Sequence, residues 1–328
     1  MTLNRRDPRF APPPPDKPIA IVNARLIDPA AGLDEPGGML TEGRRIKAVG
    51  PDLRDRGALG ADGPSEYDIR DASGAVLAPG LVDLRAALRE PGGEHMETLD
   101  SGAAAAAAGG VTTVCATPDT DPPVDDPALV EHLLRRAREI ALVRITPYAA
   151  ATRGRDGAAM TEMALLAEAG AVAFFDGDRP IADAGVMRRL LDYAATFDLI
   201  VANQPEDPAL ARGAGVTEGE LATRLGLAGA PAAAEAIMIA RDLRLARLTG
   251  ARLHVPRVTT AESVALLAAA KADGLRITCD AGVHHLAQNE VAYGAYDAMA
   301  KHAPPLRAES DRAAVVAGVA SGVIDAVA

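Results

Sequence analysis

The fold of this chain is decided by the stretch APGLVDLRAALREPG, which runs from Ala78 to Gly92. Apolar residues at 76–77 and 81–82 lead into a polar end and then into a Glu-Pro-Gly turn. This order is typical of a buried strand that opens into a loop at its carboxyl end. The stretch therefore predicts the first strand of a larger α/β domain.

Downstream of this strand, short apolar runs alternate with amphipathic stretches. Eight such units favour a closed (β/α)8 TIM barrel over the alternative, a doubly wound sheet. The predicted strands span 81–86, 111–116, 143–149, 171–175, 199–203, 252–258, 276–281 and 323–328. The predicted helices span 96–108, 127–140, 161–169, 184–197, 232–248, 261–272 and 310–320.

Upstream of the barrel, the sequence predicts two shorter segments. Residues 1–17 are rich in proline and form an arm that we expect to be flexible or docked on a partner. Residues 18–75 alternate apolar and polar side chains between Gly and Pro, which indicates a small antiparallel sheet with strands over 19–28, 44–50 and 67–71 and a turn between the first two. The barrel domain then occupies 76–328. Because no helix follows the eighth strand, we expect the sequence to be incomplete there, or the last strand to depend on another chain.

Composition restricts the class of protein. The net charge of −11 argues against nucleic acid or an anionic membrane as a partner. The two cysteines, Cys115 and Cys279, lie in apolar runs without CxxC spacing, so we expect reduced core residues in a cytoplasmic protein. No apolar run reaches the roughly twenty residues of a membrane span, and no signal-peptide core is present at the N-terminus.

The opening stretch resembles the first barrel strand of the dihydroorotase and allantoinase branch of the amidohydrolase superfamily. In that family the strand carries His-x-His and then Arg-Glu-Pro-Gly. Here the two histidine positions hold Arg85 and Ala87, whereas Arg89 and the Glu-Pro-Gly turn are kept. The resemblance covers about 18–328 and implies a metal-dependent hydrolase barrel flanked by a β-sandwich, with a zinc site at the carboxyl ends of the strands.

The resemblance implies similar losses at other strand ends. Gln204 occupies a position where the family has a histidine. Arg257 occupies the position of a family histidine that binds the metal, whereas the nearby His254 is retained. Arginine stays protonated and has no lone pair to donate, and a neutral amide is a poor zinc ligand. Asp119 and Ala303 replace substrate-contacting asparagines, although Asp119 could equally form an Asx turn.

Several groups that remain have a structural interpretation. We expect Asp176 or Asp178, which stand near a family carboxylate, to pair with Arg85 or Arg257, because an acid left without its metal is costly. For Arg89 a salt bridge that orders its loop is preferred over a carboxylate site. The vestigial site thus comprises Arg85, Ala87, Arg89, Asp119, Asp176, Asp178, Gln204, His254, Arg257, His284 and Ala303.

His284 is adjacent to His285, and neighbours on a strand point to opposite faces, so we interpret this pair as structural. No catalytic, cofactor-binding or metal-binding residue is assigned, and no cofactor is expected, although the family uses zinc.

The resemblance to dihydroorotase-like subunits without metal ligands implies a non-catalytic role in pyrimidine biosynthesis. Such a subunit would scaffold the catalytic chain of aspartate carbamoyltransferase, in a hetero-oligomer, a homodimer or both. The alternative is a divergent dihydroorotase or cyclic amidohydrolase with one metal or none, which would convert dihydroorotate and water to carbamoyl aspartate. A small-molecule sensor is a third hypothesis. We expect neither nucleic acid nor membrane as a partner.

Overall fold

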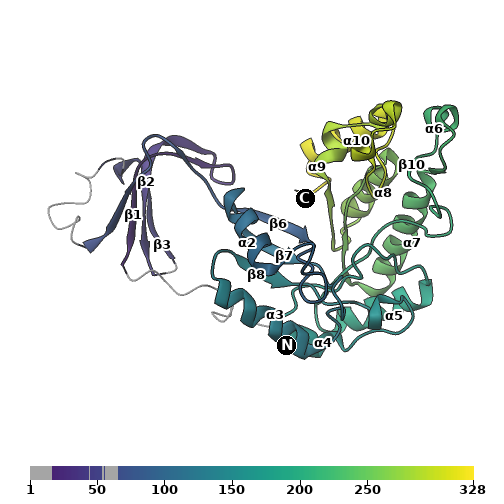
Figure 1. The fold of residues 1–328 in the computed structure, drawn as a ribbon, viewed down its shortest axis with the longest axis horizontal. Helices are drawn as coiled ribbons and strands as arrows, with labels where there is room; N and C mark the ends of the chain where they lie inside the picture. The colour runs from purple at the N-terminus through teal and green to yellow at the C-terminus, as the bar shows by residue number, and fades with distance from the viewer. Residues whose placement is uncertain (1–16, 44, 54, 56–65) are drawn as a thin grey trace.

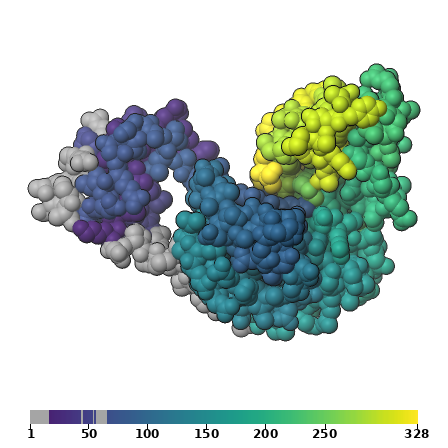
Figure 2. All heavy atoms as spheres, viewed as in Figure 1, coloured from purple at the N-terminus to yellow at the C-terminus, as the bar shows by residue number. Residues whose placement is uncertain are grey.

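A mixed sheet precedes the main domain in the computed structural model, which describes residues 17–43, 45–53, 55 and 66–328. Its strands follow the order β3-β2-β1-β4, and β5 also pairs with β1. Figure 2 shows the described N-terminal strands as a lobe beside the larger body of the molecule. The strands are β1 (Ile19–Asp28), β2 (Leu33–Glu42), β3 (Arg45–Gly50), β4 (Asp68–Asp71) and β5 (Val76–Leu77).

The prediction of an antiparallel sheet is wrong in part. β1, β2 and β3 pair antiparallel, but β4 and β5 run parallel to β1 because the chain crosses over before it returns. The sequence prediction placed only a turn where β2 lies. Gly37 has little room for a side chain there, since a Cβ would lie 2.5 Å from the Gly50 carbonyl oxygen. The proline-rich arm lies outside the described residues, except for residue 17.

The main domain is built on a run of parallel strands, as predicted. Two ladders, β6-β7-β8 and β9-β12-β13-β14, are joined through Phe174, which bridges to Ala149 and Val201. Phe174 thus takes the place of the fourth strand. The strands are β6 (Leu81–Ala86), β7 (Val111–Ala116), β8 (Arg144–Pro147), β9 (Ile200–Ala202), β12 (Arg252–Val255), β13 (Ile277–Ala281) and β14 (Ala326–Val327).

The predicted closure of this barrel is absent from the described residues. No ladder joins β14 to β6 among them, and β14 has only two residues in place of the predicted six. At the unpaired edge, Leu81 is 60% and Val82 51% exposed. The eight strand positions therefore form an open parallel array.

Helices cover the outer face of the array (Figure 1). Their starts follow from capping residues: Asp126, Asp183 and Thr260 each accept a hydrogen bond from a backbone N–H of the first turn. The helices are α2 (Leu99–Ala108), α3 (Pro127–Ile140), α4 (Met163–Ala169), α5 (Ala184–Thr196), α7 (Ala233–Thr249), α8 (Ala261–Ala272) and α10 (Glu309–Ala320). No helix of the described ranges combines the length and apolarity needed to cross a bilayer.

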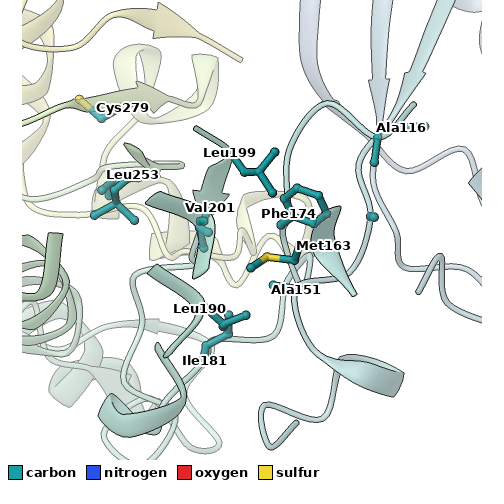
Figure 3. Packing of buried hydrophobic residues seen from close by; sticks show 14 of the residues in the cluster. Ala116, Ala151, Met163, Phe174, Ile181, Leu190, Leu199, Val201, Leu253 and Cys279 are labelled. Carbon is teal, nitrogen blue, oxygen red and sulfur yellow. The ribbon is translucent and has the colours of Figure 1, made fainter. Parts of the chain in front are cut away.

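The core lies between the strands and the helices. Phe174, Met163 and Leu190 are almost fully buried and pack together there (Figure 3). Along β12, Leu253 and Val255 join this core, so the intervening His254 points to the opposite, inner face of the array. Strand alternation therefore places polar side chains inside the array, at the ends where a site is expected.

Short elements lie above the carboxyl ends of the strands. Several of them contribute to a second apolar cluster around Tyr293 and Leu306. These elements are β10 (Val216–Thr217), α6 (Glu220–Leu225), β11 (Gly229–Ala230), α9 (Val283–Ala287), η5 (Glu290–Ala295) and η6 (Ala298–Ala300).

Candidate functional site

Two arginines contact one glutamine at the mouth of the array, by which we mean the end where the carboxyl ends of the parallel strands lie. Arg85 of β6 donates from Nη1 to Gln204 Oε1 at 3.1 Å. Arg257, just after β12, donates from Nη2 to the same oxygen at 2.8 Å. Gln204 follows β9 and is only 1% exposed. Three separate strands thus bring together the positions that the family resemblance assigns to metal ligands.

Burial and mutual repulsion make these cations unusual. The Arg85 pKa is lowered to about 10, because burial disfavours its charge and the nearby Arg257 repels it. Burial likewise lowers the pKa of Arg257. The Arg85 guanidinium carbon lies 4.8 Å above the centre of the Phe175 ring, which partly offsets this cost.

The predicted pairing of these arginines with Asp176 or Asp178 is wrong. Asp178 accepts from Arg155 Nη2 at 2.6 Å, and its side chain is 72% exposed. Asp176 accepts from the backbone N–H groups of Ala151 and Thr152 at 2.8 and 3.0 Å.

Gly177 separates the two carboxylates with a φ of +71°, so one points inward and the other outward. Asp176 is 1% exposed, and burial raises its pKa although the Thr152 hydroxyl also binds it. Asp176 therefore stabilises the loop after β8 by accepting these hydrogen bonds.

A salt bridge joins the loops that follow β6 and β7. Arg89 Nη1 donates to Asp119 Oδ2 at 2.9 Å, and Asp119 Oδ1 also binds the Thr117 hydroxyl. Glu90 accepts from the backbone N–H of Leu99 at 2.9 Å. Arg89 and Asp119 neutralise each other in this arrangement, so neither presents an uncompensated charge to a ligand.

His254 is held between its neighbours on the inner face. Its Nδ1 lies 2.9 Å from the Thr278 hydroxyl, and its Nε2 lies 2.9 Å from Asp280 Oδ2. The other Asp280 oxygen accepts from the Arg257 backbone N–H at 2.8 Å. Both ring nitrogens of His254 already have partners, so metal binding would break one of these bonds.

The placement of the histidine pair on a strand is wrong. His284 and His285 lie on α9, because the chain turns into a helix directly after β13. His285 is buried, with Nε2 3.0 Å from the Pro304 carbonyl oxygen. His284 is exposed and stacks on His302, with 4.4 Å between ring centres. His285 lies edge-on to the same His302 ring at 6.3 Å, but no metal-holding group of the described residues includes this pair.

Alanines occupy the two remaining predicted positions. Ala87 follows β6 directly and offers no ligand atom. Ala303 is exposed, and its carbonyl oxygen accepts from Arg257 Nη1. Arg257 thus bridges Gln204 and the Ala303 loop.

The side chains present do not fit a zinc site. No group of three or more His, Cys, Asp or Glu side chains that could hold a metal occurs in the described part of the chain. Guanidinium groups at two of the expected ligand positions would repel a cation.

Sequence reasoning missed the partners that support the mouth. Glu235 and Arg307 form a buried pair at 3.8 Å, and Glu235 also accepts from the Thr259 N–H at 3.0 Å. Arg155, the partner of Asp178, was missed as well. Two motifs, Thr-Cys-Asp over 278–280 and Pro-Pro-Leu-Arg over 304–307, contain Asp280 and Arg307 and could have indicated them.

Solved structures define the class of fold. The L-hydantoinase (dihydropyrimidinase) from Arthrobacter aurescens superposes with a TM-score of 0.75 at 22% identity, covering 94% of this chain and 68% of that one. A D-hydantoinase (dihydropyrimidinase) from Thermus sp. gives a TM-score of 0.70 at 24% identity, with the same coverage. The parallel array with its flanking sheet thus has the fold of these hydantoinases.

Sequence comparison identifies the family. The Dihydro-orotase-like family matches residues 74–263. The chain is 43% identical over 312 residues to a protein named dihydroorotase from Anaplasma phagocytophilum, covering 94% of this chain and 68% of that protein. It is 39% identical to one from Solibacter usitatus, covering 95% and 70%. The chain belongs to the dihydroorotase-like family, and the predicted resemblance is confirmed at that level.

Proposed function

We propose that this chain is a dihydroorotase-like protein of pyrimidine biosynthesis that does not carry out zinc-dependent catalysis. The observation that supports this proposal is the contact of Arg85 and Arg257 with Gln204. These side chains stand at three positions where the family resemblance implies histidines. A zinc-bound hydroxide needs neutral or anionic ligands around the ion, and this donor set supplies cations instead.

The proposed role is assembly with the catalytic chain of aspartate carbamoyltransferase. The loops at the mouth are held by Arg89–Asp119 and by Arg136–Glu90, at 2.9 and 3.3 Å. These two salt bridges hold the loops in place, so the loops offer an ordered surface to a partner although no metal ligand is present. The surface charge is also suited to a protein partner rather than to nucleic acid, given the net charge of −11.

Co-expression with the transferase chain of the same organism tests the assembly role. We expect the two proteins to co-purify and to elute together in size-exclusion chromatography. A transferase that reaches the same assembly state and the same activity without this chain would contradict the role.

The second candidate is an active dihydroorotase that opens or closes the cyclic amide with one metal or none. The names of the relatives favour it, since proteins about 40% identical to this chain are called dihydroorotase. The ligands of its metal would come from Asp176, Asp178, His254 or His284. In the structure Asp176 binds backbone donors, Asp178 binds Arg155, and His254 binds Asp280.

Metal content and dihydroorotase activity of the full chain discriminate between the two candidates. The dihydroorotase from Anaplasma phagocytophilum, purified in parallel without chelator, serves as the positive control. Our proposal expects no bound zinc and no turnover in either direction. Zinc together with hydrolysis of dihydroorotate would establish the second candidate instead.

A further inference from the structure

Two donors at the mouth are buried without a hydrogen-bond partner. Among the described residues, Gln204 Nε2 and Arg257 Nε are both inaccessible to solvent and unpaired. A buried donor without an acceptor costs about 1–3 kcal/mol, and native structures rarely keep one without a reason. Gln204 as a whole is only 1% exposed, so water does not satisfy this donor.

The same place holds two close positive charges, which the carboxylates of Asp280 and Asp178 offset only in part. Arg85 and Arg257 share one neutral oxygen, and neither forms an ion pair within the described ranges. The nearby carboxylates have other partners: Asp119 binds Arg89, Asp178 binds Arg155, and Asp280 binds His254. Two close guanidinium groups repel each other, and an anion between them would remove that repulsion.

The donors are also fixed in position. The Arg257 backbone N–H is anchored to Asp280 at 2.8 Å, and its backbone has a φ of +52°. The Arg85 side chain stacks on Phe175, while Gln204 extends directly from the end of β9. Planar guanidinium forks held in this manner match the geometry of a carboxylate or a phosphate group.

We propose that Arg85, Arg257 and Gln204 form a binding site for a small oxyanion, either a carboxylate or a phosphate group. The anion would accept from both guanidinium groups and from the Gln204 amide, in the part of the mouth where the family resemblance implies a metal. This inference rests on the proposed function in one respect: the mouth holds no zinc.

The test is a titration of the full-length chain with inorganic phosphate and, separately, with succinate at constant ionic strength. Binding only to the folded state raises the melting temperature in a saturable manner. We expect saturation with at least one of the two anions. A response to phosphate alone identifies a phosphoryl ligand, and a response to succinate alone identifies a carboxylate ligand.

Variants locate the site. Arg85→Gln and Arg257→Gln should each raise the apparent Kd at least about tenfold, because each removes one fork of a charge-assisted contact. Gln204→Glu keeps both arginines and supplies an internal carboxylate, so it should abolish the response while the protein remains folded. Arg188→Gln on α5, where the arginine side chain is 59% exposed, is the matched control and should leave the Kd unchanged.

Absence of a saturable response to both anions, or an unchanged response in Arg85→Gln and in Gln204→Glu, would overturn the inference. Zinc measured in the same preparation separates the two proposals. A zinc-loaded protein would contradict the proposed function, whereas a zinc-free protein that ignores both anions would contradict only the oxyanion site.

Discussion

The guanidinium groups of Arg85 and Arg257, 172 positions apart in the chain, meet at a single amide oxygen, Oε1 of Gln204. The glutamine is the only described side chain that accepts from both arginines. Its oxygen therefore reduces the electrostatic repulsion between the two guanidinium groups in the partly buried mouth of the array. The stability of this arrangement should depend strongly on that one oxygen.

Gln204→Leu should lower the free energy of unfolding by about 2–4 kcal/mol, since it removes two hydrogen bonds to charged donors and leaves the donors unpaired. Urea unfolding followed by circular dichroism measures this change. Gln288→Leu replaces an exposed glutamine and should stay within about 0.5 kcal/mol of the wild type. Equal effects of the two substitutions would contradict the assigned role of Gln204.

Removal of the charge of Asp176 should destabilise the protein much more than removal of the charge of Asp178, on the other side of Gly177. Asp176→Asn should cost about 2–4 kcal/mol, because an amide group cannot accept from all the donors that surround this buried carboxylate. Asp178→Asn should cost less than about 1 kcal/mol, since its ion pair with Arg155 is largely exposed on the Asp178 side. A similar loss of stability in both variants would contradict this distinction.

The buried His285 should make stability fall in mild acid. Burial lowers its pKa below 6.5; the hydrogen bond to the Pro304 carbonyl and the charge of Glu235 oppose this shift, and repulsion from His302 and Arg257 adds to it. The unfolded state then binds more protons than the folded state below pH 6.5. The free energy of unfolding should therefore decrease by up to about 1.4 kcal/mol per pH unit, until the pH reaches the folded-state pKa.

His285→Gln removes this titrating group and can still donate toward the Pro304 carbonyl. Urea unfolding near pH 7.5 and pH 5.5 should show a smaller pH effect in this variant than in the wild type. An identical pH effect in both proteins would show that His285 does not titrate as described.

The strand ends should accept metal ligands again if histidines are restored. We expect the combined replacement Arg85→His, Ala87→His, Gln204→His and Arg257→His to bind about one zinc per chain, because tetrahedral zinc takes neutral imidazoles. A combination of four histidines on exposed positions of α5 and α8 serves as the control. No gain of zinc over this control, in a variant shown to be folded, would contradict the placement of positions 85, 204 and 257 around one point.

Much of the fold could be predicted from the sequence because local pattern determines it. The strand 111–116 and the helices 127–140 and 261–272 were predicted with their observed bounds, since apolar periodicity and capping residues mark them. β2 was missed because Pro36, Gly37 and Gly38 obscure its pattern. The helix at His284 was missed because five residues do not establish a period.

The site was predictable in its members but not in its contacts. The motif comparison identified Arg85, Gln204 and Arg257, each at the end of a strand. The choice of ion-pair partners depends on loop geometry, which no local sequence pattern determines. Arg155, from the loop after β8, pairs with Asp178, and Arg89 pairs with Asp119. Closure of the barrel was likewise a long-range expectation, and the described residues do not show it.

We propose that cationic side chains take the place of metal ligands at the mouth, where Arg85 and Arg257 meet Gln204. The most direct test of this proposal is the zinc content of the full chain, purified without chelator, together with its dihydroorotase activity after incubation with zinc. We expect less than about 0.1 zinc per chain and no turnover above the uncatalysed rate. About one or more zinc ions per chain, with turnover that a chelator abolishes, would contradict it.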